Sequence, residues 1–164
     1  MSKEFSYPQF ENGVKVISRA GDAVNDMMMN ITAYRMEAGQ SLTFCHAAEE
    51  TAVLLILGEV TFQWNDRRET GQRNSFIEEG PHCLHVCRNV AVTVTAHTGS
   101  EVLVQSTEND REFTPVLYRP EDCRDDIFGL DVFDNKMKRT VRTVFDYRNA
   151  PYSNMVNGEV INHQ

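Results

Sequence analysis

The sequence predicts an all-β protein, and three observations lead to this prediction. Apolar and polar residues alternate over about eight or nine short segments, which recur every 8–12 residues or so. Gly, Pro and Asn residues separate these segments, and no stretch has the periodicity of a helix of convincing length. At 164 residues, the chain is long enough for one domain with a substantial core. We therefore expect an antiparallel sandwich or barrel.

The first predicted strands lie before residue 40. Residues 14–18 (VKVIS) alternate and predict a short strand, and residues 27–36 (MMMNITAYRM) predict a second one. Methionine is a flexible side chain that fills irregular gaps, so the methionine cluster indicates core rather than ligands. Residues 37–40 (EAGQ) then predict a turn.

We expect the fold to be organised around residues 39–64. Residues 51–57 form a nearly unbroken apolar run, and residues 60–64 alternate after an interruption at Gly58 and Glu59. A short apolar run that ends at a glycine and is followed by alternation predicts two antiparallel strands joined by a tight turn.

Several shorter strands follow this segment. Residues 65–68 predict a polar turn, and residues 69–74 are charged and predicted to be exposed. Further strands are predicted at 75–77, 82–86, 90–96 and 100–105. We therefore assign residues 1–106 to the β-barrel.

The chain changes character after residue 106. Residues 107–139 carry two prolines and many charges, which predicts an excursion over the barrel surface. Residues 140–164 return to strand-like patterns, TVRTVFD and MVNGEVI. We expect these C-terminal strands to pack on the barrel or on a partner subunit. Their many apolar side chains and unpaired strand edges predict a homodimer or a higher homo-oligomer.

Composition narrows the partners and the compartment. A net charge of −8 argues against nucleic acid or an anionic membrane as a partner. No window approaches the roughly 18 apolar residues of a membrane span, and the start MSKEFSYPQF does not resemble a signal peptide. The four cysteines fit reduced thiols, so we predict a cytoplasmic protein.

Polar residues near the central segment are candidates for a site. We predict that Glu50, His82 and His85 line a site for a small polar ligand; no catalytic residue is assigned. A barrel mouth lined by hydrogen-bonded polar side chains is the simpler alternative. A divalent metal is a weaker one, with His46, Glu50 and His85 as candidates, because a metal needs three or four converging ligands. His46 is out of phase with the inward positions of a strand.

Part of this segment resembles the first sequence pattern of the cupins, which are small jelly-roll barrels. In that family two patterns supply three His and one Glu to a divalent metal. Gly39 and Gly58 occupy the two glycine positions of the first pattern. Cys45 and Ala47 stand at its two His positions, and Thr51 stands at its Glu position.

The second cupin pattern is matched by His85 and Asn89, while Gly80-Pro81-His82 replaces its Pro-x-Gly. The resemblance therefore implies a single cupin-like jelly-roll barrel with a C-terminal strand extension. It also implies that most of the metal site is lost, so we expect no cofactor.

The runs EETAVLLILGEVTFQWNDR, HVCRNVAVTV and TVRTVFDYRN…NGEVI resemble the 5-deoxy-glucuronate isomerases of myo-inositol catabolism. Their relatives are the 5-keto-4-deoxyuronate isomerases of pectin breakdown. The resemblance covers about residues 28–162 and corresponds to the N-terminal half of a tandem cupin. In that family a Glu stands at the position of Glu50, and the catalytic metal lies in the second half, on a His-x-His motif. The resemblance implies a sugar-acid isomerase-like protein of carbohydrate catabolism, with a small sugar acid as its partner.

Two other functions fit the same residues. One is a non-catalytic module for sugar-acid binding or oligomerisation, and the other is a free-standing metal cupin with irregular ligands. An aldose–ketose isomerase needs a base and an electrophile. Glu50 would be the base and His85 or His82 a proton donor, but the sequence offers no good electrophile. The ending fits either a piece of a longer tandem cupin or a short single-cupin relative.

Overall fold

The structure is a computed structural model that describes residues 9–23 and 26–162. The first eight residues of the predicted barrel domain and the last two of the predicted extension lie outside the described residues. Within the described part, the chain forms twelve strands and one short 3-10 turn. No helix in this part is long and apolar enough to cross a membrane.

The elements follow one another along the chain with short connections. In order they are β1 (Val14–Ser18), β2 (Asn30–Met36), β3 (Ser41–Phe44), β4 (Glu49–Trp64), β5 (Arg67–Arg73), β6 (Cys83–Val86), β7 (Val92–Ala96), β8 (Ser100–Glu108), β9 (Val116–Tyr118), η1 (Pro120–Asp122), β10 (Arg124–Phe128), β11 (Arg139–Phe145) and β12 (Asn157–Asn162).

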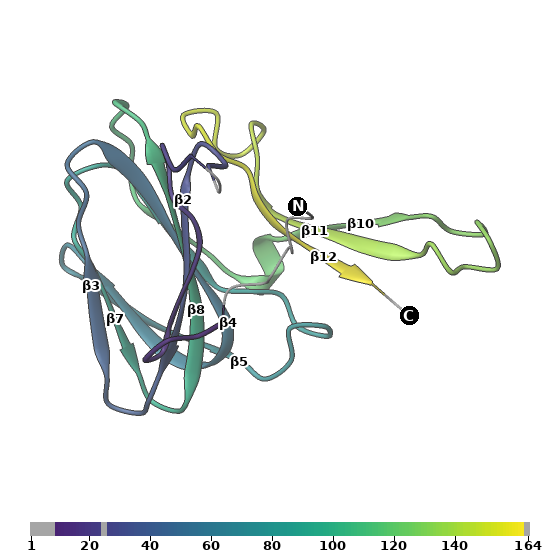
Figure 1. Ribbon diagram of the computed structural model, residues 1–164, viewed down its shortest axis with the longest axis horizontal. Helices are drawn as coiled ribbons and strands as arrows, with labels where there is room; N and C mark the ends of the chain where they lie inside the picture. Colours follow the sequence, from purple (N-terminus) through teal and green to yellow (C-terminus); the bar gives the residue numbers. More distant parts are fainter. Residues whose placement is uncertain (1–8, 24–25, 163–164) are drawn as a thin grey trace.

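Two layers of antiparallel strands face each other, and both contain β4 (Figure 1). The first layer has the order β1-β2-β8-β4-β6-β9. In the second layer β3 pairs with β7, and β4 pairs with both β7 and β5. The predicted all-β class is therefore confirmed, as a sandwich whose layers share one long strand.

Strand β4 corrects the prediction of two strands joined by a turn at Gly58 and Glu59. The chain runs through this point as one strand of 16 residues. Its first half pairs with β8, and its second half pairs with β5 and β7. Gly58 has a φ of +100°, and a Cβ there would collide with Ser100, so the strand changes layers where only glycine fits. Locally, a glycine bend and a tight turn leave the same signal.

Three further segments differ from the sequence prediction. Residues 67–73, predicted as a turn and an exposed charged segment, form strand β5, whereas residues 75–77, predicted as a strand, form a turn. Strand β3 was not predicted. The pairing of β5 with β4 explains its charged sequence, because edge strands carry charged side chains that discourage pairing with other chains.

The C-terminal part forms a small sheet with the order β10-β11-β12, which projects beside the sandwich (Figure 1). One side of it faces the sandwich and buries Thr140, Arg142 and Ile161. The predicted excursion over residues 107–139 also contributes β9, which pairs with β6 in the first layer. The end of the chain is thereby attached to the sandwich over much of its length.

The molecule has two separate cores. The interior core lies between the two layers and includes Val53, Leu55, Phe62 and Trp64. The second core lies on the outer face of the first layer, where side chains of β4 and β6 contact residues 144–155. Alternate residues of β4 serve the two cores, because successive side chains of a strand point to opposite faces.

Candidate functional site

The most unusual polar feature is a carboxylate–imidazole pair in the second core. Glu50 lies on β4, His85 lies on β6, and Glu50 Oε2 is 2.8 Å from His85 Nε2. Neither residue has exposed surface. Charged side chains are seldom buried so completely unless a partner compensates for the lost hydration. The contact between the two side chains supplies that compensation.

Residues near the end of the chain complete the coordination of Glu50. The hydroxyl of Ser153 donates to Oε2 at 3.0 Å, and the backbone N–H of Asn154 donates to Oε1 at 2.6 Å. Asn154 also donates from its side chain to the backbone carbonyl of Glu108. Both carboxylate oxygens are therefore satisfied by this chain itself.

These contacts set the ionisation of Glu50. Burial by itself raises the pKa of the carboxyl group, and it is the largest single influence. The hydrogen bonds from His85, Asn154 and Ser153, together with the charge of His85, outweigh burial and lower the pKa below its ordinary value. Glu50 is therefore ionised near neutral pH and is a weak base.

Aromatic rings enclose His85. Its ring is stacked on Phe145, with centroids 4.3 Å apart, and Phe113 lies 4.7 Å away at a tilt. Tyr152 stacks in turn on Phe113 at 4.3 Å. His85 Nδ1 is buried and has no hydrogen-bond partner among the described residues. The imidazole is thus held by stacking and by its single contact with Glu50.

The pair lies outside the sandwich, not in a barrel mouth. Val53 and Leu55 on β4 point between the layers, whereas Ala52 and Leu54 point to the outer face. Glu50 has the same parity as Ala52, and in the pairing of β4 with β6 Ala52 is opposite His85. Both candidates therefore share the outer face, and residues 145–154 cover them.

His82, the third predicted ligand-lining residue, has different neighbours. Burial is the main cause that lowers its pKa; the charge of Glu121 opposes this effect, and those of Arg119 and Arg73 add to it. His82 Nδ1 is buried without a partner in the described part of the chain. No contact that the structure describes joins His82 to Glu50 or His85.

His46 lies in the loop between β3 and β4. Its Nδ1 is 3.3 Å from Glu49 Oε2, and both side chains are partly exposed. Its backbone carbonyl accepts a hydrogen bond from the N–H of Asn89, which joins this loop to the one after β6. His46 is thus separated from the buried pair and contacts the neighbouring carboxylate instead.

The positions of the cupin metal pattern do not fit a metal here. Cys45 and Ala47 are exposed in a loop, and Thr51 is a buried hydroxyl on β4. His85 points to the outer face, away from these positions. Among residues 9–23 and 26–162, no three His, Cys, Asp or Glu side chains are close enough together to hold an ion.

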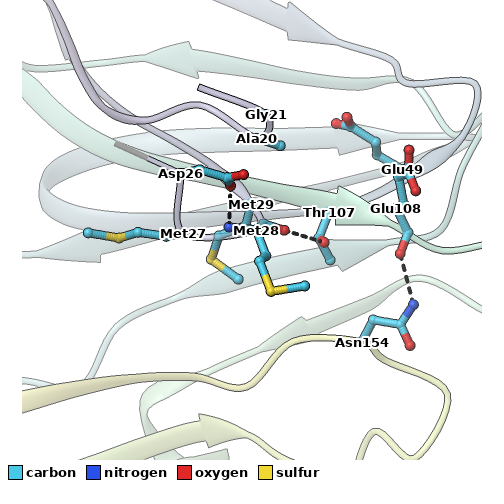
Figure 2. A pocket seen from close by; sticks show the side chains of 10 residues that line it. All are labelled: Ala20, Gly21, Asp26, Met27, Met28, Met29, Glu49, Thr107, Glu108 and Asn154. Carbon is cyan, nitrogen blue, oxygen red and sulfur yellow. Dashed lines mark hydrogen bonds between the residues drawn. The ribbon is translucent and has the colours of Figure 1, made fainter. Parts of the chain in front are cut away.

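A pocket of about 630 Å³ lies where the loop before β2 approaches the ends of β4 and β8 (Figure 2). Its wall contains three carboxylates, those of Asp26, Glu49 and Glu108, and it includes Asn154. Figure 2 shows that no Lys or Arg is among the ten residues that line it. The pocket therefore repels anions, and a sugar acid does not suit it.

Ser153 and Asn154 were not among the predicted site residues. They belong to a Pro- and Asn-rich turn, and they follow Glu50 by more than a hundred residues. The only local signal was the concentration of turn-forming residues at 149–154, which predicts a turn but no partner for it.

The chain was compared with known proteins by sequence and by structure. The model of the KduI/IolB family matches residues 5–164. None of the curated proteins matches the sequence.

Among solved structures, an IolB-like protein from Salmonella typhimurium LT2 superposes with a TM-score of 0.77 at 20% identity. The match covers 88% of this chain and 54% of that chain, so this chain spans about half the length of its relative. An RmlC-like cupin protein from Desulfovibrio desulfuricans matches 57% of this chain and 79% of its own, at 20% identity and a TM-score of 0.45. The Cnp3 cupin domain of Schizosaccharomyces pombe matches 63% of this chain and 68% of its own, at 10% identity and a TM-score of 0.46.

The predicted jelly-roll-like all-β fold is confirmed, in the form of an open sandwich and not a closed barrel, and the IolB-like structure shares this fold. The family assignment depends on the sequence match, which extends over almost the whole chain. This protein belongs to the KduI/IolB family.

Proposed function

We propose that this protein is a sugar-acid isomerase-like cupin of cytoplasmic carbohydrate catabolism, in the breakdown of inositol or uronates, and that this chain does not hold a catalytic metal by itself. Membership of the KduI/IolB family supports the substrate class. The chain spans 54% of the IolB-like relative, so in this proposal the reacting centre is supplied by a second domain or another subunit.

The main support for placing the reacting centre elsewhere is that Glu50 is buried and fully hydrogen-bonded. Isomerisation of an aldose to a ketose requires a base that reaches a C–H bond of the substrate. Glu50 has no exposed surface, and its two oxygens already accept three hydrogen bonds, from His85, Ser153 and Asn154. A carboxylate in this state holds the C-terminal turn against the sandwich and is not available to a substrate.

An isomerase assay on the purified chain tests the proposal. D-galacturonate would be incubated with the chain and with added Mn²⁺, Zn²⁺ or Fe²⁺, and NMR would follow conversion to the ketose. We expect no turnover above the buffer rate, and elemental analysis should find well under one equivalent of metal per chain. Turnover would support the substrate class but contradict the proposed dependence on a second domain or another subunit, and one equivalent of metal that is lost in His46→Ala would contradict the proposed lack of a metal. His46 is partly exposed, so this variant should remain folded.

A second role, in assembly, is favoured by the outward side of the small sheet. Val160 on β12 and Phe128 on β10 are exposed there, and Val156 lies just before β12. Strand β12 is at the edge of its sheet and leaves backbone groups unpaired. We propose that two copies of the chain pair through this side as a homodimer or as part of a larger homo-oligomer.

Point substitutions test this role better than truncation does, because residues 144–155 also fill the second core. Light scattering on the intact chain should give at least twice the monomer mass, and Val160→Lys should reduce it. Ile77→Lys is the matched control, because Ile77 is an exposed apolar residue in the loop between β5 and β6. A monomeric intact chain would reject assembly and leave the metal prediction unaffected.

A further inference from the structure

A second pocket, of about 660 Å³, lies at one end of the sandwich, where three loops meet. The loops follow β4, follow β6 and precede β9. The lining residues are Asn65, Cys87, Arg88, Asn89, Val90, Glu112, Phe113, Thr114 and Pro115. Arg88 is the only Lys or Arg among them, which sets this pocket apart from the acidic pocket of Figure 2.

Arg88 is held only loosely by the protein. Its Nη2 donates to Glu112 Oε1 at 3.3 Å, and the Glu112 side chain is 76% exposed. Its Nε is buried and has no partner among the described residues. An unsatisfied buried donor is unfavourable, and few native side chains tolerate one without a ligand or a water nearby. The Nε–Nη2 edge of this guanidinium therefore makes only one long hydrogen bond and leaves the Nε donor unsatisfied.

That edge has the geometry of a carboxylate receptor. Two parallel N–H groups of an arginine fork bind the two oxygens of one carboxylate, an arrangement stronger than a neutral hydrogen bond. A carboxylate that displaces the exposed Glu112 side chain would gain both Nε and Nη2. The displaced Glu112 would lose little, because ion pairs with an exposed partner are weak.

The rest of the wall suits a hydroxylated ring. Asn65, Asn89 and Thr114 bring amide and hydroxyl groups that make no hydrogen bond with other described side chains. Phe113 supplies an apolar surface, and its position is fixed because it packs on Tyr152 and His85. Asn65 and Asn89 have φ values of 46° and 61°, a conformation that asparagine adopts more readily than most residues.

We propose that the Arg88 pocket binds a hydroxylated carboxylate of the uronate class. Arg88 holds the carboxylate, Asn65, Asn89 and Thr114 contact the hydroxyl groups, and Phe113 packs against the ring. The choice of a sugar acid rests on the proposed function, whereas the charge preference rests on the pocket alone. The site binds and positions the acid without reacting with it.

Titration of the full chain with D-glucuronate tests this site, with D-glucose as the neutral ring of similar size. Perturbed amide signals in a ¹H–¹⁵N NMR spectrum should map to residues 65, 87–90 and 112–114. We expect saturable binding of glucuronate and at least about tenfold weaker binding of glucose, the size of effect expected for a charge-assisted bidentate contact.

Three variants locate the contact. Arg88→Gln should weaken glucuronate binding at least about tenfold, and Glu112→Gln should strengthen it, because the internal competitor loses its charge. Arg35→Gln is the matched control, since Arg35 also forms a surface pair with a glutamate, Glu101, on the distant strands β2 and β8. The control should bind glucuronate like the unmodified chain.

Equal affinity for glucuronate and glucose would overturn the proposal, as would an equal loss in Arg88→Gln and Arg35→Gln. If thermal unfolding shows that Arg88→Gln is not folded, glucuronate binding by Arg88→Lys and Glu112→Gln tests the proposal instead. The lysine keeps the charge but loses the planar fork, so affinity should fall. Glucuronate binding by a monomeric chain would support the site and reject assembly, so the two proposals fail separately.

Discussion

The two faces of the first layer are packed by different kinds of residue. The inner face meets the second layer through apolar side chains, among them Val53, Leu55 and Leu84. The outer face meets residues 139–162 through apolar contacts and through a set of buried polar ones. Glu50 binds Ser153 and Asn154, and Arg73, opposite Gly58 where β4 changes layers, binds Glu159.

The difference shows how apolar and polar contacts each determine which segments pack together. Apolar burial is strong but has no direction, so it holds two layers together without fixing one arrangement. A buried carboxylate or guanidinium tolerates only a partner that satisfies its hydrogen bonds. We infer that the apolar interior stabilises the sandwich, and that polar contacts fix where the C-terminal segment docks. Four predictions test this division, from the largest expected effect to the smallest.

The largest effect is expected in the interior core. Phe62 on β4 is fully buried, and Phe62→Ala should lower the free energy of unfolding by about 3–5 kcal/mol, because a close-packed site cannot collapse around the lost ring. Met155→Ala in the second core should lower it by about 2 kcal/mol, because Met155 lies in the loop before β12, which can relax. Urea unfolding would compare them, and equal losses would mean that the cores are equally rigid.

The next effect concerns the buried pair. Glu50→Ala should lower the free energy of unfolding by about 3 kcal/mol, because it leaves His85 and two donors of the C-terminal turn without an acceptor. The double variant Glu50→Leu/His85→Leu should recover part of the loss, since no polar group of the pair then remains buried. Glu49→Gln is the control; its partly exposed carboxylate should be worth less than about 1 kcal/mol.

A smaller effect is expected where Arg73 meets β12. Arg73 is fully buried and binds both oxygens of Glu159 at 2.7 Å, as well as the backbone carbonyls of Leu55, Phe76 and Glu79. Glu159→Gln removes the charge but leaves the carbonyl contacts, so a loss of about 1–2 kcal/mol is expected.

Hydrogen exchange should show where Glu159 acts. Amides of β12 should exchange faster in Glu159→Gln, while those of β4 and β8 keep their protection. Glu101→Gln, which removes an exposed pair with Arg35, serves as the control. Faster exchange throughout the sandwich would show that the two regions unfold together.

The smallest effect is a pH dependence. The folded pKa of Glu50 lies below its ordinary value of 4.5, so its contribution is complete above that value and is lost as pH falls through the folded pKa. Asp146 should also lose its contribution to stability as pH falls, because hydrogen bonds from the backbone N–H of Arg148 and the side chain of Arg124 lower its pKa. Stability should therefore begin to fall below about pH 6.5, because burial of His82 opposes its protonation in the folded state, and should fall further below about pH 4.5, where Glu50 and Asp146 lose their charge.

Comparison of the unmodified chain with Glu50→Gln isolates the part of the pH dependence of stability that is due to Glu50. Its urea midpoint should fall less between pH 7 and pH 4 than that of the unmodified chain, and Asp146→Asn should remove a separate part of the slope. An unchanged slope in Glu50→Gln would place the acid sensitivity elsewhere.

Patterns among neighbouring residues were enough to predict the fold class and most of the strands. Alternation over residues 92–96 and 100–105 reflects one buried and one outer face, which is a property of neighbouring residues. The sequence also singled out Glu50, His82 and His85 as candidates, because Glu50 directly precedes the apolar run and His85 matches the second cupin pattern. Local patterns carry this information because the burial of a strand is repeated every second residue.

The course of β4 and the role of the polar residues depend on contacts between distant parts of the chain. Gly58 gives the same local signal in a turn and in a bend between layers, and only the pairing of each half with different strands separates the two. Likewise, Glu50 became a structural carboxylate because Ser153 and Asn154, far along the chain, reach its oxygens. Contacts between distant residues leave no periodic trace in the sequence, since they depend on where the whole chain places its segments.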